Sequence, residues 1–168
     1  LVEYARKYIG TPYRRGSKGP NRFDCSGFMQ YIFNHFSYSL NASSASQYLQ
    51  GISVKDEEIC RGDLVFFKGR NSRRSNVGHV GLVTEVYPDG RFKFIHASTS
   101  QGIREDWNFS PYYAQRYVGA RRIYFVQIDK RLILDAILEL EDIDDNTPFT
   151  ETEKSITPQE FSTFVRAE

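Results

Sequence analysis

The residues best suited to chemistry in this sequence are one cysteine and two of its three histidines. Cys25 directly follows Asp24 at the start of a predicted helix. A thiolate is a strong nucleophile, but a free thiol is mostly protonated at neutral pH. The partial positive charge of a helix N-terminus favours the thiolate, whereas a close negative charge on Asp24 opposes it. A reactive Cys25 therefore needs a base or a cation beside it.

The histidines are the candidate bases. His35 lies ten residues after Cys25 on the same predicted helix, almost three turns away, so we expect it to be only a surface or packing residue. His79 and His96 open and close a predicted hairpin, in which cross-strand Cβ atoms lie about 5 Å apart. One imidazole could then orient the other. Cys25, His79 and His96 would act as nucleophile, base and orienting residue, in the chain order of papain-like enzymes.

Two other functions are open to the same three residues. Cys25, His79 and His96 supply a plausible ligand set for zinc, and a binding module without turnover could also contain them.

The second cysteine, Cys60, precedes a turn and is predicted to be structural, although a Cys25–Cys60 disulfide could form in an oxidising compartment. No CxxC pair occurs in the sequence. We expect neither a metal nor a cofactor.

Helices are predicted first along the chain and strands afterwards. Apolar spacing predicts helices at residues 1–9, 25–36 and 43–51, with a Gly- and Pro-containing loop at 10–23. Strands are predicted within 61–69, 79–87, 91–98 and 118–126, with a turn at 88–90. This order indicates an α+β fold in which the helix that carries the nucleophile packs on a central antiparallel sheet.

The charge of the chain changes sign near residue 127. Residues 1–126 contain 18 Lys and Arg against 10 Asp and Glu, a net charge of +8, and residues 127–168 contain 4 against 11, a net charge of −7. We expect a domain over 1–126 and an acidic extension over 127–168, which could fold over the basic body and shield its groove. The basic body favours an anionic partner. Nucleic acid is the weaker candidate, because no nucleic-acid-binding signature accompanies the charge.

Five segments resemble, in order, the NlpC-type cysteine peptidases, which are papain-like hydrolases of bacterial cell-wall peptides. They are "YIGTPYRRGS", "FDCSGFMQYIF", "GDLVFFK", "GHVGLV" and "FIHAS", and the resemblance covers residues 4 to about 124. The segments "HASTSQGI" and "YYAQRYVGARRI" are most similar to the Spr-like murein endopeptidases within that family. The resemblance implies a papain-like NlpC-type fold.

The resemblance also implies a role for each matching residue. Cys25 would be the nucleophile, His79 the general base, and His96 the residue that orients His79. Tyr13 matches an active-site tyrosine, which would help to hold the oxyanion together with the N–H groups of Cys25 and Ser26.

Two further positions match residues that line the substrate groove of the family. They are Asp24, which is as well explained as a helix N-cap, and Ser44 within "NASSASQ". The chain departs from the family pattern at "YRRGS", at "LNASSASQ", and in the longer hairpin between His79 and His96. These departures affect the groove contacts and the choice of bond rather than the triad.

The resemblance implies a monomeric murein endopeptidase that acts on peptidoglycan peptides. It would cut either the cross-link between D-Ala and diaminopimelate, which we favour slightly, or the stem between D-Glu and the diamino acid. The chain begins at Leu1, and we expect a removed signal segment. The expected location is the bacterial envelope, in the periplasm or attached to the outer membrane.

Overall fold

The computed structural model describes residues 1–69 and 76–124. The helices are α1 (Val2–Arg6), α2 (Cys25–His35), α3 (Ser44–Gln47) and α4 (Pro111–Ala114), with a 3-10 turn, η1, at Asp56–Glu58. The strands are β1 (Ile52–Val54), β2 (Leu64–Lys68), β3 (Val77–Val86), β4 (Phe92–Ser98), β5 (Gly102–Trp107) and β6 (Tyr117–Arg122). The basic segment 70–74 and the predicted acidic extension 127–168 lie outside the described residues, so the extension and its shielding role stay predictions.

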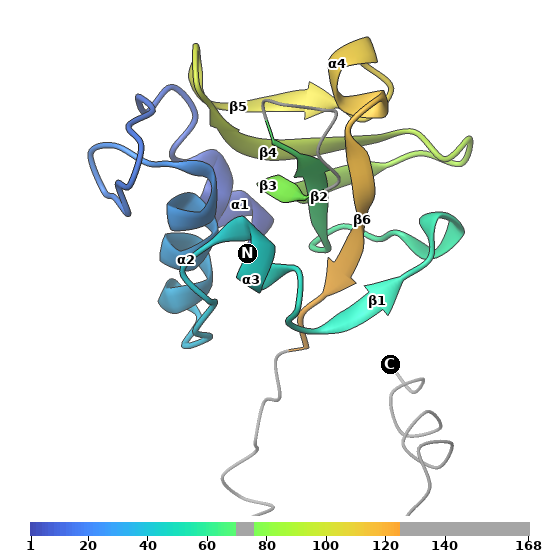
Figure 1. Ribbon diagram of the computed structural model, residues 1–168, viewed down its shortest axis with the longest axis horizontal. Helices are drawn as coiled ribbons and strands as arrows, with labels where there is room; N and C mark the ends of the chain where they lie inside the picture. Colours follow the sequence, from blue (N-terminus) through green and yellow to red (C-terminus); the bar gives the residue numbers. More distant parts are fainter. Residues whose placement is uncertain (70–75, 125–168) are drawn as a thin grey trace, which may run out of the picture. The chain divides into compact units, whose positions relative to one another are not determined.

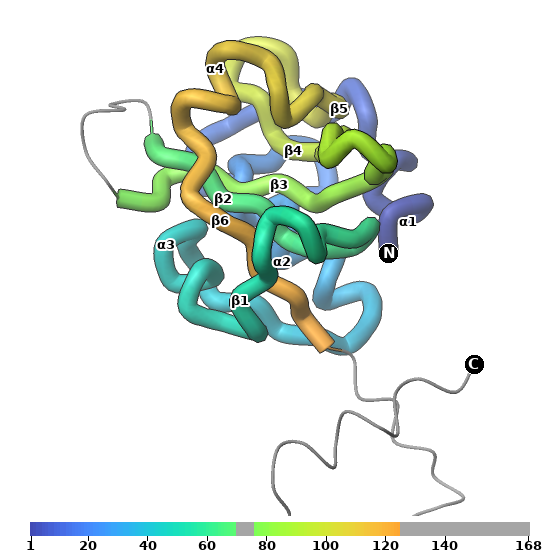
Figure 2. Tube along the Cα trace, turned by 90° about the vertical axis from the view of Figure 1, so that its right-hand side faces the viewer, coloured from blue at the N-terminus to red at the C-terminus, as the bar shows by residue number. Residues whose placement is uncertain are grey.

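The strands form one antiparallel sheet in the order β1-β6-β2-β3-β4-β5. Helices α1, α2 and α3 gather on one side of this sheet (Figure 1). Figure 2 shows β6, the last described strand, running between β1 and β2. The predicted α+β class, with the N-terminal helices packed on an antiparallel sheet, is therefore confirmed.

Strand β2 separates two hydrophobic clusters. Leu64 and Phe66 belong to the cluster that contains the apolar residues of α2, such as Phe28. Val65 and Phe67 belong to a second cluster, against which Tyr113 of α4 packs. Successive strand side chains point to opposite faces, so the two clusters cover the two sides of the sheet. The first cluster fixes α2, and with it Cys25, against β2 and β3.

The start of α2 is fixed by Asp24. Its Oδ1 accepts a hydrogen bond from the Gly27 N–H at 2.6 Å, and its Oδ2 accepts one from the Gly16 N–H at 2.8 Å. One carboxylate therefore caps the helix and also ties down the 10–23 loop. A Cβ atom at Gly27 would lie 2.3 Å from the carbonyl oxygen of Ser17. The loop consequently packs directly on the first turn of α2, beside Cys25.

The structure differs from the predicted elements at several places. The first helix ends at Arg6 rather than at residue 9, and the chain turns at Gly10, which has a φ of +90°. The third helix is shorter than predicted, because only Ser44–Gln47 is helical. Strands β1 and β5 were not predicted. The sequence of β5, "GIREDW", lacks a sustained apolar alternation because β5 is an edge strand with charged positions.

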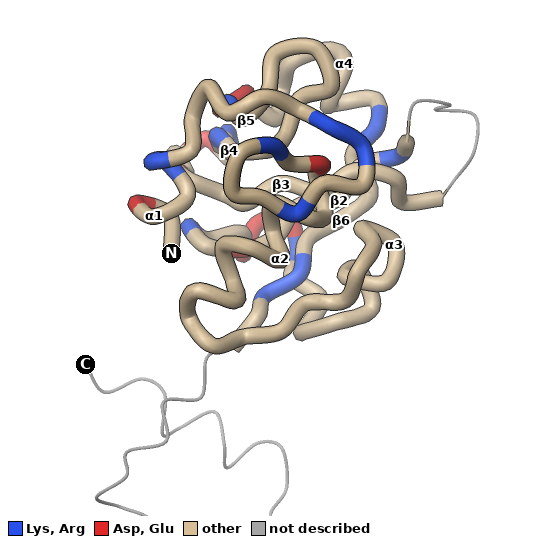
Figure 3. The backbone as a smooth tube through the Cα atoms, turned by 90° about the vertical axis from the view of Figure 1, so that its left-hand side faces the viewer, with Lys and Arg blue, Asp and Glu red and all other residues tan. Residues whose placement is uncertain are grey.

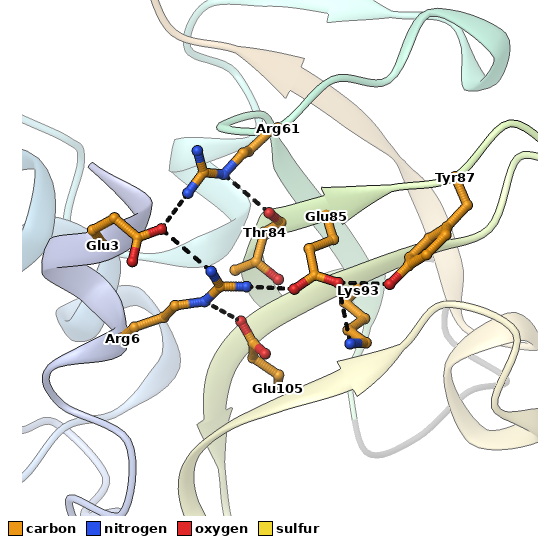
Figure 4. A network of polar contacts seen from close by, with 8 residues as sticks. All are labelled: Glu3, Arg6, Arg61, Thr84, Glu85, Tyr87, Lys93 and Glu105. Carbon is orange, nitrogen blue, oxygen red and sulfur yellow. Dashed lines mark hydrogen bonds and ion pairs between the residues drawn. The ribbon is translucent and has the colours of Figure 1, made fainter.

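A network of charged side chains connects α1 to the sheet (Figure 4). Arg6 donates to Glu85 of β3 at 2.7 Å and to Glu105 of β5 at 2.8 Å. Glu85 also accepts from Lys93 at 3.1 Å and from the Tyr87 hydroxyl at 2.6 Å. Because Arg6 bridges two strands that are separated by β4, it fixes the segment that leads into the 10–23 loop.

Replacement of this bridge is expected to destabilise the fold. Arg6→Met should lower the free energy of unfolding by about 1–2 kcal/mol, because Glu105 loses its charged donor while only partly exposed. Urea denaturation measures the change. Arg91→Met is the matched control, since Arg91 pairs with Asp89 on an exposed turn, and should change stability by no more than about 0.5 kcal/mol. Equal effects of the two variants would contradict a bridging role for Arg6.

Basic residues mark the loop between α1 and α2. Figure 3 looks onto this side of the molecule, where Lys and Arg positions outnumber Asp and Glu along the loop. The residues are Arg14, Arg15, Lys18 and Arg22.

Among the described residues, no helix has the length and apolar character needed to span a membrane.

Candidate active site

Cys25 is the first residue of α2, and its thiol lies between that helix and β3. The side chain is partly buried against the first hydrophobic cluster. Backbone N–H groups of Ser26, on the helix, and of Val80, on β3, face the sulfur. The structure therefore brings the predicted nucleophile to the residue that directly follows His79.

The environment of Cys25 favours the neutral thiol. Burial raises the pKa of Cys25 to about 11, and the negative charge of Asp24 adds to this effect. The N–H groups of Ser26, Val80 and Cys25 itself oppose the rise without cancelling it. The helix N-terminus therefore does not make a thiolate by itself. The opposing charge of Asp24, expected from the sequence, is present, and the thiol needs a base to react.

The raised pKa predicts how Cys25 reacts with iodoacetamide. Only the thiolate is alkylated, so the rate at Cys25 should still be increasing above about pH 9, where an ordinary thiol of pKa about 8.5 is already ionised. Peptide mapping by mass spectrometry at a series of pH values measures the rate at each cysteine, with exposed Cys60 as the internal reference. A rate at Cys25 that is constant above neutral pH would show a resting thiolate and contradict this prediction.

His79 and His96 are hydrogen-bonded to each other. His79 Nε2 and His96 Nδ1 are 2.9 Å apart, and the two rings meet at 84°. Strand register pairs Leu82 with Ile95, so His96 lies opposite Gly81 rather than opposite His79. A Cβ atom at position 81 would lie 2.6 Å from the Phe94 ring and 3.3 Å from the Cβ atom of His96. The missing side chain of Gly81 leaves the space in which the two rings meet diagonally.

Both imidazoles are held in the neutral form. Burial lowers the pKa of His79 to about 3, and the neighbouring His96 lowers it further, while Asp106 acts weakly in the opposite direction. His96 is completely inaccessible to solvent, and burial lowers its pKa as well, against the effect of a hydrogen bond to Asp106. A neutral imidazole has one unprotonated nitrogen, so His79 has the protonation state that a general base requires.

Three residues that the sequence did not reveal complete the surroundings of His96. The Nε2 atom of His96 lies 2.9 Å from Asp106 Oδ2 and 3.2 Å from the hydroxyl of Tyr113. Arg104 donates to Asp106 Oδ1 at 2.6 Å. His96 pairs with Arg104 across β4 and β5, so Asp106 is its diagonal neighbour on the same face. The spacing of Arg104 and Asp106, two residues apart, could have indicated that they share one face of the sheet. It does so only once β5 is recognised as a strand.

Tyr13 and Ser26 lie close to the thiol. Tyr13 packs against the first hydrophobic cluster, and burial raises its pKa, to which the Cys25 thiol once ionised and the negative charge of Asp24 also contribute. Ser26 is buried, and its hydroxyl donates to Asp24 Oδ1 at 3.2 Å. Cys25 and Ser26 are the first two residues of α2, whose N–H groups have no partner within a helix. Those groups are placed to receive negative charge.

Asp24 and Ser44 are held by structural contacts. Both oxygens of Asp24 accept the backbone hydrogen bonds that cap α2 and hold the loop, and its contact with a substrate stays a prediction. Ser44 is the buried first residue of α3, whose start is capped by the Ser43 hydroxyl. The Gln47 side chain of α3 donates to the Ser26 carbonyl at 3.0 Å, which joins α3 to the start of α2.

The hydrogen bonds of the histidines disfavour the zinc alternative. His96 uses one ring nitrogen towards His79 and the other towards Asp106, so it could bind a metal only after one of these bonds is broken. Within residues 1–69 and 76–124, no three His, Cys, Asp or Glu side chains are arranged to hold a metal ion. Cys25 and Cys60 are both free thiols in the structure.

The similarities to known proteins lie in the region that contains this site. Residues 10–122 match the NlpC/P60 family. The chain is similar to the murein DD-endopeptidase MepS/murein LD-carboxypeptidase of Escherichia coli, with 36% identity over 73% of this chain and 61% of the relative. It is also similar to the gamma-DL-glutamyl hydrolase of Bacillus subtilis, with 33% identity over 77% of this chain and 30% of the relative.

The fold agrees with these similarities. A Staphylococcus aureus protein of the NLP/P60 family, described as similar to lipoprotein, has 32% identity and a TM-score of 0.63, over 74% of this chain and 40% of that chain. The chain thus spans less than two thirds of each of these three proteins. The matched segment includes Cys25, His79 and His96, covers more than half of the sequence, and shows that the chain belongs to the NlpC/P60 family.

Proposed function

We propose that this protein is a cysteine peptidase that hydrolyses peptide bonds in peptidoglycan, with Cys25 as nucleophile, His79 as general base and His96 as orienting residue. The observation that carries the proposal is the 2.9 Å hydrogen bond between His79 and His96, on a strand whose next residue faces the Cys25 thiol. Membership of the NlpC/P60 family supports the substrate class.

The reaction starts from a neutral thiol and a neutral imidazole. The Nε2 atom of His79 is engaged with His96, which leaves Nδ1 to accept the proton of Cys25. The sulfur attacks the carbonyl carbon of the substrate, and His79 then returns the proton to the departing amine. A thioester remains on Cys25. Water, deprotonated by His79, attacks this thioester, releases the new carboxylic acid and restores the thiol.

Negative charge on the substrate oxygen requires donors beside the thiol. The N–H groups of Cys25 and Ser26 point from the N-terminus of α2, where the helix dipole also favours negative charge. Tyr13 lies close enough to Cys25 for their charges to interact, and we assign its hydroxyl as a further donor. Asp24 and Ser44 are assigned to the substrate groove.

The names of two relatives correspond to the two candidate bonds. The relative from Escherichia coli is named a DD-endopeptidase and the relative from Bacillus subtilis a gamma-DL-glutamyl hydrolase. We propose cleavage of the D-Ala–diaminopimelate cross-link, because the identity to the former is the higher of the two. We propose that the protein acts as a monomer at the bacterial envelope, where this substrate lies, either in the periplasm or attached to the outer membrane. Nucleic acid is not among the proposed partners.

Mass spectrometry of muropeptides tests the proposal and distinguishes the two bonds. Cross-linked dimers and uncross-linked monomers are incubated separately with the protein, with Cys25→Ala and with Cys60→Ala as the matched control. Conversion of dimers to monomers, lost only in Cys25→Ala, is expected. Cleavage of monomer stems between D-Glu and the diamino acid would replace the proposed bond by the other one. If both muropeptides stay intact with the unmodified protein, the peptidase function is wrong.

A further inference from the structure

Asp106 of β5 binds the side of His96 that faces away from His79. Its Oδ2 lies 2.9 Å from His96 Nε2, and the hydroxyl of Tyr113 donates to the same oxygen at 3.3 Å. Its Oδ1 accepts from Arg104 Nη2 at 2.6 Å. The carboxylate is mostly shielded from solvent, with 17% of its side chain exposed. His79, His96 and Asp106 therefore form a continuous hydrogen-bonded row across β3, β4 and β5.

Asp106 is ionised at neutral pH. Burial alone would raise its pKa, but the hydrogen bond and charge of His96, the charge of Arg104 and the hydrogen bond from Tyr113 together lower it. An ionised carboxylate has acceptors and no donor. The nitrogen that faces it, His96 Nε2, must therefore carry a proton.

That proton determines the state of both rings. His96 is neutral because burial lowers its pKa, so a proton on Nε2 leaves Nδ1 unprotonated, and Nδ1 accepts the hydrogen bond from His79. The donor is then His79 Nε2, 2.9 Å away. His79 is also neutral, so its Nδ1 has a free electron pair. This is the nitrogen that the mechanism assigns to the thiol proton.

We propose that Asp106 is the positioning residue of the general base: its carboxylate fixes the tautomer of His96 and, through His96, the tautomer of His79. The inference rests on the proposed function, since it concerns the base of that reaction. No proton travels along the row, and no bond to Asp106 forms or breaks. When His79 accepts the thiol proton at Nδ1, it keeps its Nε2 proton and its hydrogen bond to His96.

Without Asp106, the two imidazoles would have no preference for the tautomers in which both rings are protonated on Nε2. A hydrogen bond between two neutral rings is equally well made in the opposite sense, with His96 Nδ1–H as the donor and His79 Nε2 as the acceptor. In that state the proton of His79 lies on Nδ1, where it blocks uptake of the thiol proton. Asp106 removes this state, because it would place the unprotonated His96 Nε2 against a carboxylate.

Arg104 makes the inference testable by an isosteric substitution. In Asp106→Asn the side-chain amide has one oxygen and one NH2 group. If the oxygen faces His96, the NH2 group meets the donor of Arg104, and two donors oppose each other. The favourable orientation gives the oxygen to Arg104 and the NH2 group to His96 Nε2. Asp106→Asn therefore imposes the wrong tautomer on His96. Asp106→Ala imposes no tautomer, because the Tyr113 hydroxyl, 3.2 Å from His96 Nε2, can still accept a hydrogen bond from a protonated Nε2.

The two variants separate positioning from packing. Asp106→Asn should lower kcat for muropeptide hydrolysis by at least about 100-fold, and Asp106→Ala by only about tenfold, with KM within about twofold in both. A merely structural carboxylate predicts the opposite order, because alanine removes more contacts than asparagine. Asp89→Asn makes the same change on an exposed turn and should leave kcat unaltered. A loss in Asp106→Ala equal to or greater than that in Asp106→Asn would overturn the inference.

Nitrogen-15 spectra of the histidine rings test the same inference without turnover. In the unmodified protein, Nε2 should be protonated and Nδ1 unprotonated in both His79 and His96, and Asp106→Asn should reverse both, with His35 as the reference ring. A proton on His79 Nδ1 in the unmodified protein would overturn the inference. If these tautomers are found but no muropeptide is cleaved, the proposed function fails and the positioning stands. If muropeptides are cleaved and Asp106→Asn keeps its kcat, the function stands and the positioning fails.

Discussion

Cys25→Ser is expected to reduce kcat for muropeptide hydrolysis by at least about 10³-fold while the protein stays folded. The substitution keeps the shape of the side chain at a partly buried position, so the packing of α2 on β3 should persist. A serine hydroxyl is a far weaker acid than a thiol. His79, whose pKa burial lowers to about 3, is too weak a base to activate it.

Steady-state kinetics on cross-linked muropeptides measure this loss, and thermal unfolding verifies the fold. Cys60→Ser is the matched control, because Cys60 is exposed and its thiol donates to the Glu58 backbone carbonyl, away from Cys60's backbone contacts with Asp63. The control should retain full activity. A Cys25→Ser variant with more than about a tenth of the original kcat would contradict the assignment of the nucleophile.

His79→Gln is expected to have two large effects. It should lower kcat by about 10²- to 10⁴-fold, since the base that accepts the thiol proton is lost. It should also weaken the dependence of stability on pH. In the unfolded chain His79 takes up a proton below pH 6.5, whereas in the folded protein burial lowers its pKa to about 3. Between these two values the unfolded state binds more protons, so the folded state loses stability as the pH falls.

The expected slope is about 1 kcal/mol per pH unit for His79, somewhat below the full 1.4 because the ring is only partly buried. His96 adds a slope of the same sign, since burial lowers its pKa too. Urea denaturation at pH 7 and pH 5 should therefore show a smaller loss of stability in His79→Gln than in the unmodified protein. His35→Gln, which removes an exposed histidine stacked on Tyr4, is the matched control. Equal slopes in all three proteins would show that His79 is not buried in the neutral form.

The parts of the site that could be predicted from the sequence are those carried by local patterns. Asp24 before the apolar stripe of α2 marks the helix start, and that places Cys25. The alternation around His79 and His96 marks two strands of one hairpin. The diagonal meeting of the rings depends on the register at Gly81, which the hairpin pattern alone does not fix.

Other features depend on tertiary burial and could not be predicted. The helix start favours a thiolate at Cys25, yet burial and the charge of Asp24 raise the pKa of Cys25 to about 11 and outweigh the effect of the N–H groups. Asp106 was missed because β5 has charged residues on an edge strand, without the apolar alternation that identifies β3 and β4. The contacts of Arg6 with Glu85 and Glu105 join residues far apart in the sequence, so only the folded chain reveals them.

The most direct test of the proposed mechanism is to detect the thioester on Cys25. An excess of protein is mixed with cross-linked muropeptide, the reaction is stopped with acid at successive times, and the digested protein is analysed by mass spectrometry. The proposed mechanism predicts a transient adduct, with the mass of the acyl half of the substrate, on the peptide that contains Cys25. The adduct should appear before the acid product and be absent from Cys25→Ser. Release of product with no adduct on Cys25 at any time, or with an adduct on Cys60, would contradict it.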